Sequence, residues 1–90
     1  MSRIYLPTIM RRIAKSDSTV SIDGGTVGEV LHGLVTTYPE LRKHIFDDAG
    51  RPLRYLLVVL NGDDIRTLDG VQTTVRDGDE VQLLPAMAGG

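Results

Sequence analysis

The sequence contains no cysteine and no tryptophan, and only four of its 90 residues are aromatic. A chain without thiols cannot form a disulfide framework, a thiolate zinc site or a cysteine nucleophile. The scarcity of aromatic rings argues against a base-stacking platform for single-stranded nucleic acid. Twelve acidic and ten basic side chains give a formal net charge of −2, which disfavours a general nucleic-acid binder. We therefore expect no nucleic-acid partner.

Long apolar runs are also missing. No stretch approaches the roughly 18 apolar residues that span a bilayer, and residues 1–16 lack the continuous apolar segment of a secretory signal. Residues 1–16 contain four bases and no acid, which also suits an organellar transit peptide. We favour a first strand that enters a basic loop, because losing this segment would take Ile4, Leu6 and Ile9 from a small core. We expect a cytoplasmic protein that binds no membrane.

The hydrophobic pattern predicts one α+β domain with several strands and one main helix. Strands are predicted at 3–9, 18–23 and 54–60, at a short segment near Ile65, and at 80–85. Pro7 lacks a backbone N–H, so it favours an edge position or a bulge in the first strand. Residues 10–17 are predicted to form a polar, basic connection, and Asn61-Gly62 is typical of a two-residue hairpin.

The main helix is predicted to begin at Thr26 and to end near Tyr38. Thr26 and Glu29 have the spacing of a capping box, in which each side chain satisfies a free backbone N–H. Apolar side chains then recur every three or four residues on one face: Val27, Val30, Leu31, Leu34, Val35 and Tyr38. Pro39 ends the helix, and residues 40–46 are predicted to form a further turn.

Alternation along the strands assigns side chains to the two faces of the sheet. One set is predicted to face the helix: Leu56, Val58 and Leu60, with Val81 and Leu83. The other set lies on the face that a single helix cannot cover: Leu57, Val59 and Leu84. We call these three residues the sheet patch, because an exposed apolar patch typically marks a partner surface. The alternative is that they reflect only the β-propensity of the strands.

Side chains suited to catalysis or metal binding form no recognisable motif. His32 and His44 are separated by twelve positions and no cysteine accompanies them, so surface histidines are a better interpretation than metal ligands. Residues 24–28 are glycine-rich but lack the lysine of a phosphate-binding loop, which favours a tight turn before the helix. We expect a protein that is not an enzyme and binds no metal or cofactor.

The last five residues, Ala86-Met87-Ala88-Gly89-Gly90, form a predicted tail after a domain that spans residues 1–85. Five extended residues reach at most about 17 Å, far enough to enter a buried active site on another protein. The two glycines have no Cβ, so a narrow channel can close around them and leave the carboxylate of Gly90 as the reactive group. An inert end made of small residues is the alternative.

Three segments together resemble the ubiquitin-like sulfur-carrier family, which includes the small subunit of molybdopterin synthase and the carrier of thiamine biosynthesis. They are residues 60–62 (LNG), 77–81 (DGDEV) and 84–90 (LPAMAGG). The resemblance covers nearly the whole chain and implies a β-grasp fold, a mixed sheet of four to five strands with one main helix on one face. Residues 6–11 (LPTIMR) and the ending are similar to the actinobacterial carrier that supplies cysteine synthesis.

This resemblance implies a cycle in which a ubiquitin-activating-like adenylyltransferase uses ATP to adenylate the carboxylate of Gly90. Sulfide or a persulfide donor then replaces AMP and leaves a thiocarboxylate, while residues 86–89 enter the active sites of partners. In the cysteine route, the implied later partners are a pyridoxal-phosphate-dependent cysteine synthase and a metallopeptidase. Molybdopterin, thiamine and tRNA thiolation remain open as destinations. Two other functions also remain open. One is a protein modifier joined to targets through Gly90, and the other is a β-grasp interaction module with an inert tail.

Overall fold

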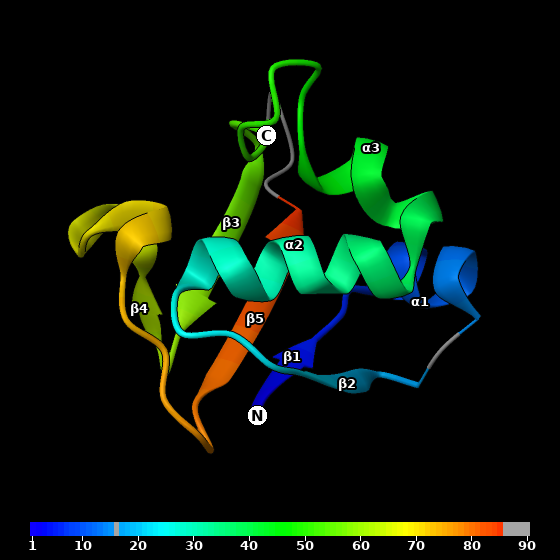
Figure 1. The fold of residues 1–90 in the computed structure, drawn as a ribbon. Coiled ribbons are helices and arrows are strands. Elements are labelled where there is room, and N and C mark those ends of the chain that lie inside the picture. Colours follow the sequence, from blue (N-terminus) through cyan, green and yellow to red (C-terminus); the bar gives the residue numbers. More distant parts are fainter. Residues whose placement is uncertain (16, 86–90) are drawn as a thin grey trace.

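Helix α2 lies across one face of a mixed β-sheet (Figure 1). The computed structural model describes residues 1–15 and 17–85. Within these ranges the strands are β1 (Ser2–Tyr5), β2 (Thr19–Ile22), β3 (Leu56–Leu60), β4 (Asp63–Asp64) and β5 (Glu80–Pro85). The helices are α1 (Thr8–Ala14), α2 (Val27–Thr37) and α3 (Arg42–Ile45), with short 3₁₀ turns η1 (Pro39–Leu41), η2 (Ile65–Thr67) and η3 (Gly70–Gln72). The predicted α+β fold with a mixed sheet is confirmed.

Strand β5 is at the centre of the sheet, whose strand order is β2-β1-β5-β3-β4. It pairs parallel with β1, where Ile4 lies beside Val81, and antiparallel with β3, where Leu56 lies opposite Pro85. Parallel strands end at the same edge of a sheet. The end of β5 and the start of β3 therefore lie together, and we call this edge the exit edge, because the chain leaves β5 there. Strand β1 runs toward the same edge but ends at Tyr5, beside Gln82.

Helix α2 forms as the capping box and the apolar stripe predict. The Thr26 hydroxyl accepts the backbone N–H of Glu29 at 3.2 Å, and the Glu29 carboxylate accepts the N–H of Gly25 at 2.9 Å. The helix ends at Thr37, directly before Tyr38 and the proline that opens η1. Its inward side chains are buried: Val27, Val30, Leu31, Leu34 and Val35.

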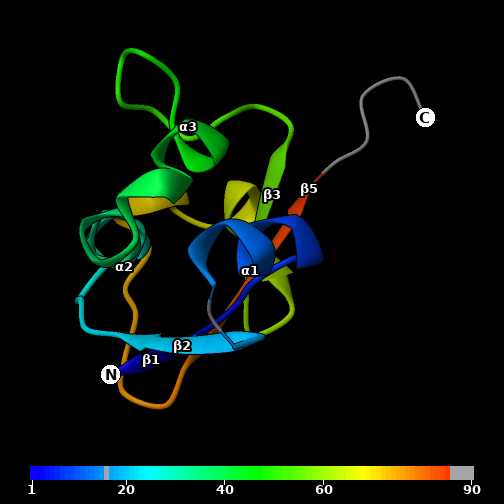
Figure 2. The same ribbon diagram turned by 90° about the vertical axis from the view of Figure 1, so that its right-hand side faces the viewer.

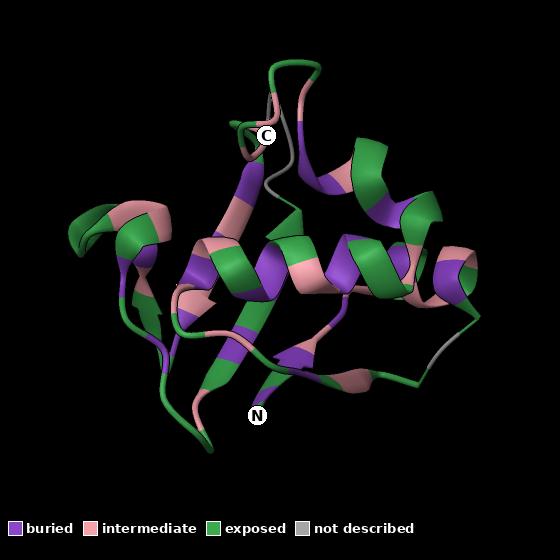
Figure 3. Cartoon of the chain, viewed as in Figure 1, coloured by how far each residue is buried: buried purple, intermediate pink, exposed green. Residues whose placement is uncertain are grey.

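The core lies between α2 and the sheet (Figure 3). The predicted choice of faces is confirmed, because β3 alternates between buried Leu56, Val58 and Leu60 and less buried neighbours. Strand β5 likewise buries Val81 and Leu83. Since alternation has a period of two, these five residues fix which face of the sheet remains outside.

Helix α1 corrects the prediction of a loop at residues 10–17. Pro7 follows β1 in an extended conformation at the start of α1, so it lies neither in an edge strand nor in a bulge. Proline suits this position because it has no N–H to leave unpaired. Met10 and Ala14 are spaced four residues apart and are buried, which gives α1 its inward face, and Lys15 ends it in the left-handed region at φ 54°. The predicted core position of Ile9 is also wrong, since its side chain is 50% exposed.

The hairpin after β3 confirms the Asn61-Gly62 prediction, because both residues have positive φ (49° and 92°) and β4 pairs antiparallel with β3. The short strand is Asp63–Asp64, however, and Ile65 begins the turn η2 instead of lying in a strand. The Asp64 carboxylate accepts the backbone N–H of Arg66 and so caps that turn. This local hydrogen bond ends the strand at Asp64, one residue before the apolar Ile65.

Candidate functional site

The sheet patch lies on the face of the sheet opposite α2. Figure 2 shows α2 on one side of the β3–β5 ladder. Leu57 is directly opposite Leu84, and Val59 is two residues further along β3, opposite Gln82. Leu84 is 37% exposed, and Leu57 and Val59 are half-buried. The structure therefore brings all three predicted residues together on two adjacent strands.

The same face becomes polar toward the opposite edge of the sheet. The Tyr5 hydroxyl lies 3.1 Å from a carboxylate oxygen of Glu80, and the Arg3 guanidinium lies 3.8 Å from the same oxygen. The hydrogen bond with Tyr5 and the nearby Glu80 charge raise the pKa of Arg3. The apolar half of the face is consequently the half next to the exit edge.

Exposed apolar side chains gather around the exit edge. Tyr55 is 54% exposed and immediately precedes β3, whose first residue pairs with Pro85. Ile9, in the first turn of α1, is 50% exposed, and α1 follows directly after β1. Ile9 could not be recognised as a surface residue from its sequence, because its apolar side chain matched the predicted strand. The predicted tail residues Ala86, Met87, Ala88, Gly89 and Gly90 lie outside the described residues.

The two turn motifs of the sequence meet in the structure. The Asn61 amide donates to Asp79 at 3.1 Å, and its oxygen accepts the backbone N–H of Glu80 at 2.9 Å. Asp79 also accepts the backbone N–H of Arg76, and these hydrogen bonds lower the pKa of the Asp79 carboxyl. The motifs thus tie the β3–β4 hairpin to the start of β5, at the edge remote from the exit edge. Their role in the described chain is structural.

Metal-binding clusters are absent from residues 1–15 and 17–85, where no three His, Asp or Glu side chains come together to hold an ion. His32 stacks on Phe46 with ring centroids 4.8 Å apart, and His44 lies on α3. The same ranges contain no helix with the length and apolarity to span a bilayer.

These features define the class of protein: a ubiquitin-like β-grasp domain with an apolar surface beside the end of its last strand. The model of the ThiS family matches residues 4–90, and the chain belongs to that family. The predicted family resemblance is confirmed.

Curated relatives and solved structures agree with this assignment. The sulfur carrier protein CysO of Mycobacterium tuberculosis is 34% identical over 89 residues, which are 97% of this chain and 96% of that protein. Small archaeal modifier protein 3 of Haloferax volcanii is 38% identical over 68 residues, covering 76% of this chain and 73% of its own. A crystal structure of the Amycolatopsis orientalis BexX/CysO complex contains a chain with a TM-score of 0.89 and 28% identity, and all of both chains is covered.

Proposed function

We propose that this protein is a sulfur carrier whose C-terminal Gly90 carboxylate is adenylated by a partner enzyme and converted to a thiocarboxylate. The observation that carries the proposal is the ThiS family match, which continues through the Gly-Gly ending to residue 90. The full-length similarity to a sulfur carrier of M. tuberculosis supports the same function. Residues 1–85 then act as the domain that the partner recognises, and residues 86–90 act as the tail that it receives.

The chemistry needs no catalytic side chain from this chain. A carboxylate is a poor electrophile, and attack on the α-phosphorus of ATP by the Gly90 carboxylate gives an acyl adenylate and pyrophosphate. Hydrosulfide then attacks the acyl carbon, AMP leaves with the bonding electron pair, and a thiocarboxylate remains. A thioacid is a stronger acid than a thiol, so it is ionised and nucleophilic at neutral pH. ATP is used by the partner, and we place the cycle in the cytoplasm.

The sheet patch is the proposed contact with the adenylating partner. Leu57, Val59 and Leu84 lie on the exposed face next to the exit edge, where a protein that holds the tail must approach. Burial of such apolar surface is favourable at about 25 cal/mol per Å². In the A. orientalis BexX/CysO structure a similar chain is in complex with a second protein, which supports a protein partner for this surface.

Cysteine synthesis is the proposed destination of the sulfur. The sequence similarity to CysO proteins and the ending LPAMAGG support it. In this route the thiocarboxylate adds to an aminoacrylate on a pyridoxal-phosphate-dependent cysteine synthase, and a metallopeptidase cleaves the cysteine from Gly90. The synthase and the peptidase are the proposed later partners.

Intact-mass measurement tests the carrier function. The protein is incubated with its adenylating enzyme, ATP and sulfide, and we expect the exchange of one oxygen for sulfur at the C-terminus. Omission of ATP and deletion of Gly90 are the controls, and both should leave the mass unchanged. A wild-type mass that does not change under these conditions would refute the proposal.

A protein modifier is the second candidate, favoured by the 38% identity to an archaeal modifier protein. In this function the acyl adenylate passes to a lysine amine of a target, and an isopeptide bond forms at Gly90. Higher-mass conjugates in a lysate that disappear when Gly90 is deleted would support it. If neither sulfur exchange nor conjugates are found, the remaining function is that of an interaction module.

A further inference from the structure

The connection between β1 and β2 is longer than the pairing of these strands requires. Antiparallel neighbours can be joined by a two-residue turn. Here residues 6–18 make the connection and include the helix α1, which buries only Met10 and Ala14. Ile13 also packs partly against the core, and the exposed side chains of α1 add a surface beside the sheet.

That surface is strongly basic. Segments 8–15 and 39–45 together contain five of the ten Lys and Arg residues but only one of the twelve acidic residues, Glu40. The rest of the chain has five bases and eleven acids. We call the five bases of these two segments the basic ridge: Arg11, Arg12, Lys15, Arg42 and Lys43.

The bases of the ridge form no salt bridge with the described residues. Arg12, Lys15, Arg42 and Lys43 are exposed, and no member of the ridge forms an ion pair with another residue of 1–15 or 17–85. In contrast, Arg51 and Arg66 lie 3.7 Å and 2.7 Å from carboxylates of their own loops. Unpaired like charges on adjacent helices repel one another, so the ridge gains most from an external anionic surface.

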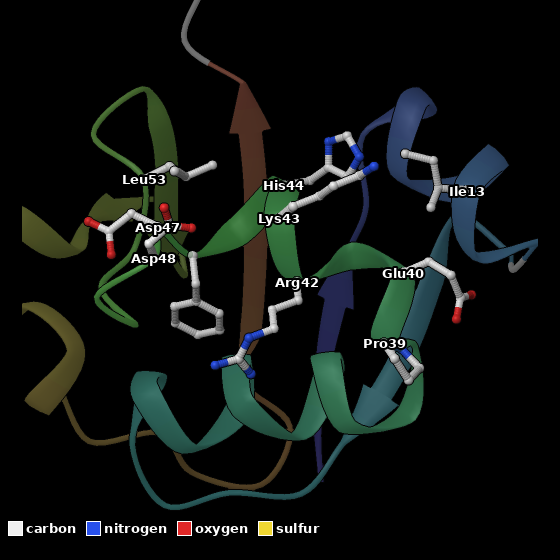
Figure 4. Close-up of a pocket in the computed structure, with 10 residues that line it drawn as sticks. Ile13, Pro39, Glu40, Arg42, Lys43, His44, Asp47, Asp48 and Leu53 are labelled. Carbon is white, nitrogen blue, oxygen red and sulfur yellow. The ribbon is translucent and has the colours of Figure 1, made fainter.

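The two helices of the ridge border one open hollow of about 910 Å³. Ile13 lines it from α1, and the side chains of Lys43 and His44 point from α3 toward Ile13 (Figure 4). Asp47 and Asp48 lie at the other side of the hollow, and Asp47 is already bound by the N–H groups of Ala49 and Arg51. On the α1 side the hollow is thus lined by the apolar Ile13, with Lys43 facing it and Glu40 on the same side.

The ridge is placed where a partner that takes the tail must dock. Two residues separate the end of β1 from the start of α1, and β1 runs parallel to β5 toward the exit edge. The molecule measures 28 × 27 × 24 Å, and a standard interface covers about 800 Å² on each partner. An interface of that area is wide compared with these dimensions, so one interface has room to cover both the sheet patch and part of α1.

We propose that the basic ridge docks an acidic, partly apolar surface of the adenylating partner and so extends the sheet patch around the exit edge. This inference rests on the proposed function. The sheet patch supplies apolar burial, while the ridge steers the encounter and sets the orientation of the carrier. A nucleic acid is disfavoured as the occupant, because the whole chain is acidic and has few aromatic side chains.

Charge reversal in the sulfur-exchange reaction tests the ridge. We expect Arg12→Glu and Lys43→Glu each to raise the KM of the adenylating enzyme for the carrier about three- to tenfold, with kcat within about twofold of wild type. Arg76→Glu makes the same charge change at the remote edge and should leave KM within about twofold. Raising salt from about 0.05 M to about 0.5 M should remove most of the difference, because the Debye length shortens to a few ångströms.

Several outcomes would overturn the inference. A KM that is unchanged in both ridge variants does so, as does an equal effect of Arg76→Glu. A fluorescent RNA that binds wild type but not Lys43→Glu, with KM unchanged, would show a nucleic-acid site instead. If a Glu variant melts below wild type, Arg12→Gln and Lys43→Gln must still raise KM. Failure of the wild type to bind the enzyme or gain sulfur would instead reject the proposed function, and this inference with it.

Discussion

Replacement of Asn61 by alanine should destabilise the domain more than any other change in an exposed turn, because this residue combines two structural roles. Its φ of 49° lies in the left-handed region, which costs alanine roughly 1 kcal/mol more than asparagine or glycine. Its side chain also forms two hydrogen bonds, to Asp79 and to the N–H of Glu80, each contributing about 0.5–1 kcal/mol at an exposed site. The expected loss in the free energy of unfolding is about 2–3 kcal/mol.

Thermal and urea unfolding measure this loss. For a domain of this size, each kcal/mol shifts the Tm by about 4–8 °C, so Asn61→Ala should lower the Tm by roughly 10–20 °C. Asn61→Gly is the matched control, since glycine adopts the left-handed conformation but cannot make the hydrogen bonds. It should lose about 1–2 kcal/mol. Equal losses in the two variants would refute the backbone contribution, and an alanine variant as stable as wild type would refute the whole reasoning.

Three further predictions follow from other contacts. Gly33→Ala should lower the Tm although alanine is the better helix former, because its Cβ would lie 2.7 Å from the Ile22 side chain; a higher Tm would contradict that contact. Hydrogen bonds lower the pKa values of Asp64 and Asp79 below the ordinary 3.8, so the folded state binds fewer protons than the unfolded chain. The free energy of unfolding should therefore fall as pH drops below about 5, and Tm measured across this range should not rise. Leu57→Asp should weaken the complex with the adenylating enzyme in a titration and keep the circular dichroism of wild type, since Leu57 is half-buried on the outer face; a collapse of the fold would show that it belongs to the core.

The main helix and the two faces of the sheet could be predicted from the sequence, because their signals are local and periodic. Thr26 and Glu29 mark the helix start at a fixed spacing, and the polar Glu80 and Gln82 assign the faces of the last strand. Residues 56–60 are all apolar, so their inward set is predicted from the place of Leu60 at the hairpin. The predicted faces place Leu57 and Leu84 on the same side of the sheet, and the pairing of β3 with β5 puts them directly opposite each other. Their role with a partner remains a prediction.

Helix α1 could not be predicted from its own residues. Its seven residues are too few for an isolated helix, and its two buried side chains are four apart in a segment rich in arginine. The helix forms because tertiary packing buries Met10 and Ala14, which the local pattern does not contain. The exposure of Ile9 depends on that packing in the same way, because the helix turns Met10 and Ala14 toward the core and leaves Ile9 on its outer side.

The central position of β5 has a mechanical consequence. A pull applied to the chain beyond Pro85 acts along β5, which is held by the β1 ladder on one side and the β3 ladder on the other. Such a force shears both ladders, so their hydrogen bonds resist together instead of opening one at a time as at a sheet edge. A partner could therefore bind the end of the chain, apply force to it and release it repeatedly while the domain stays folded.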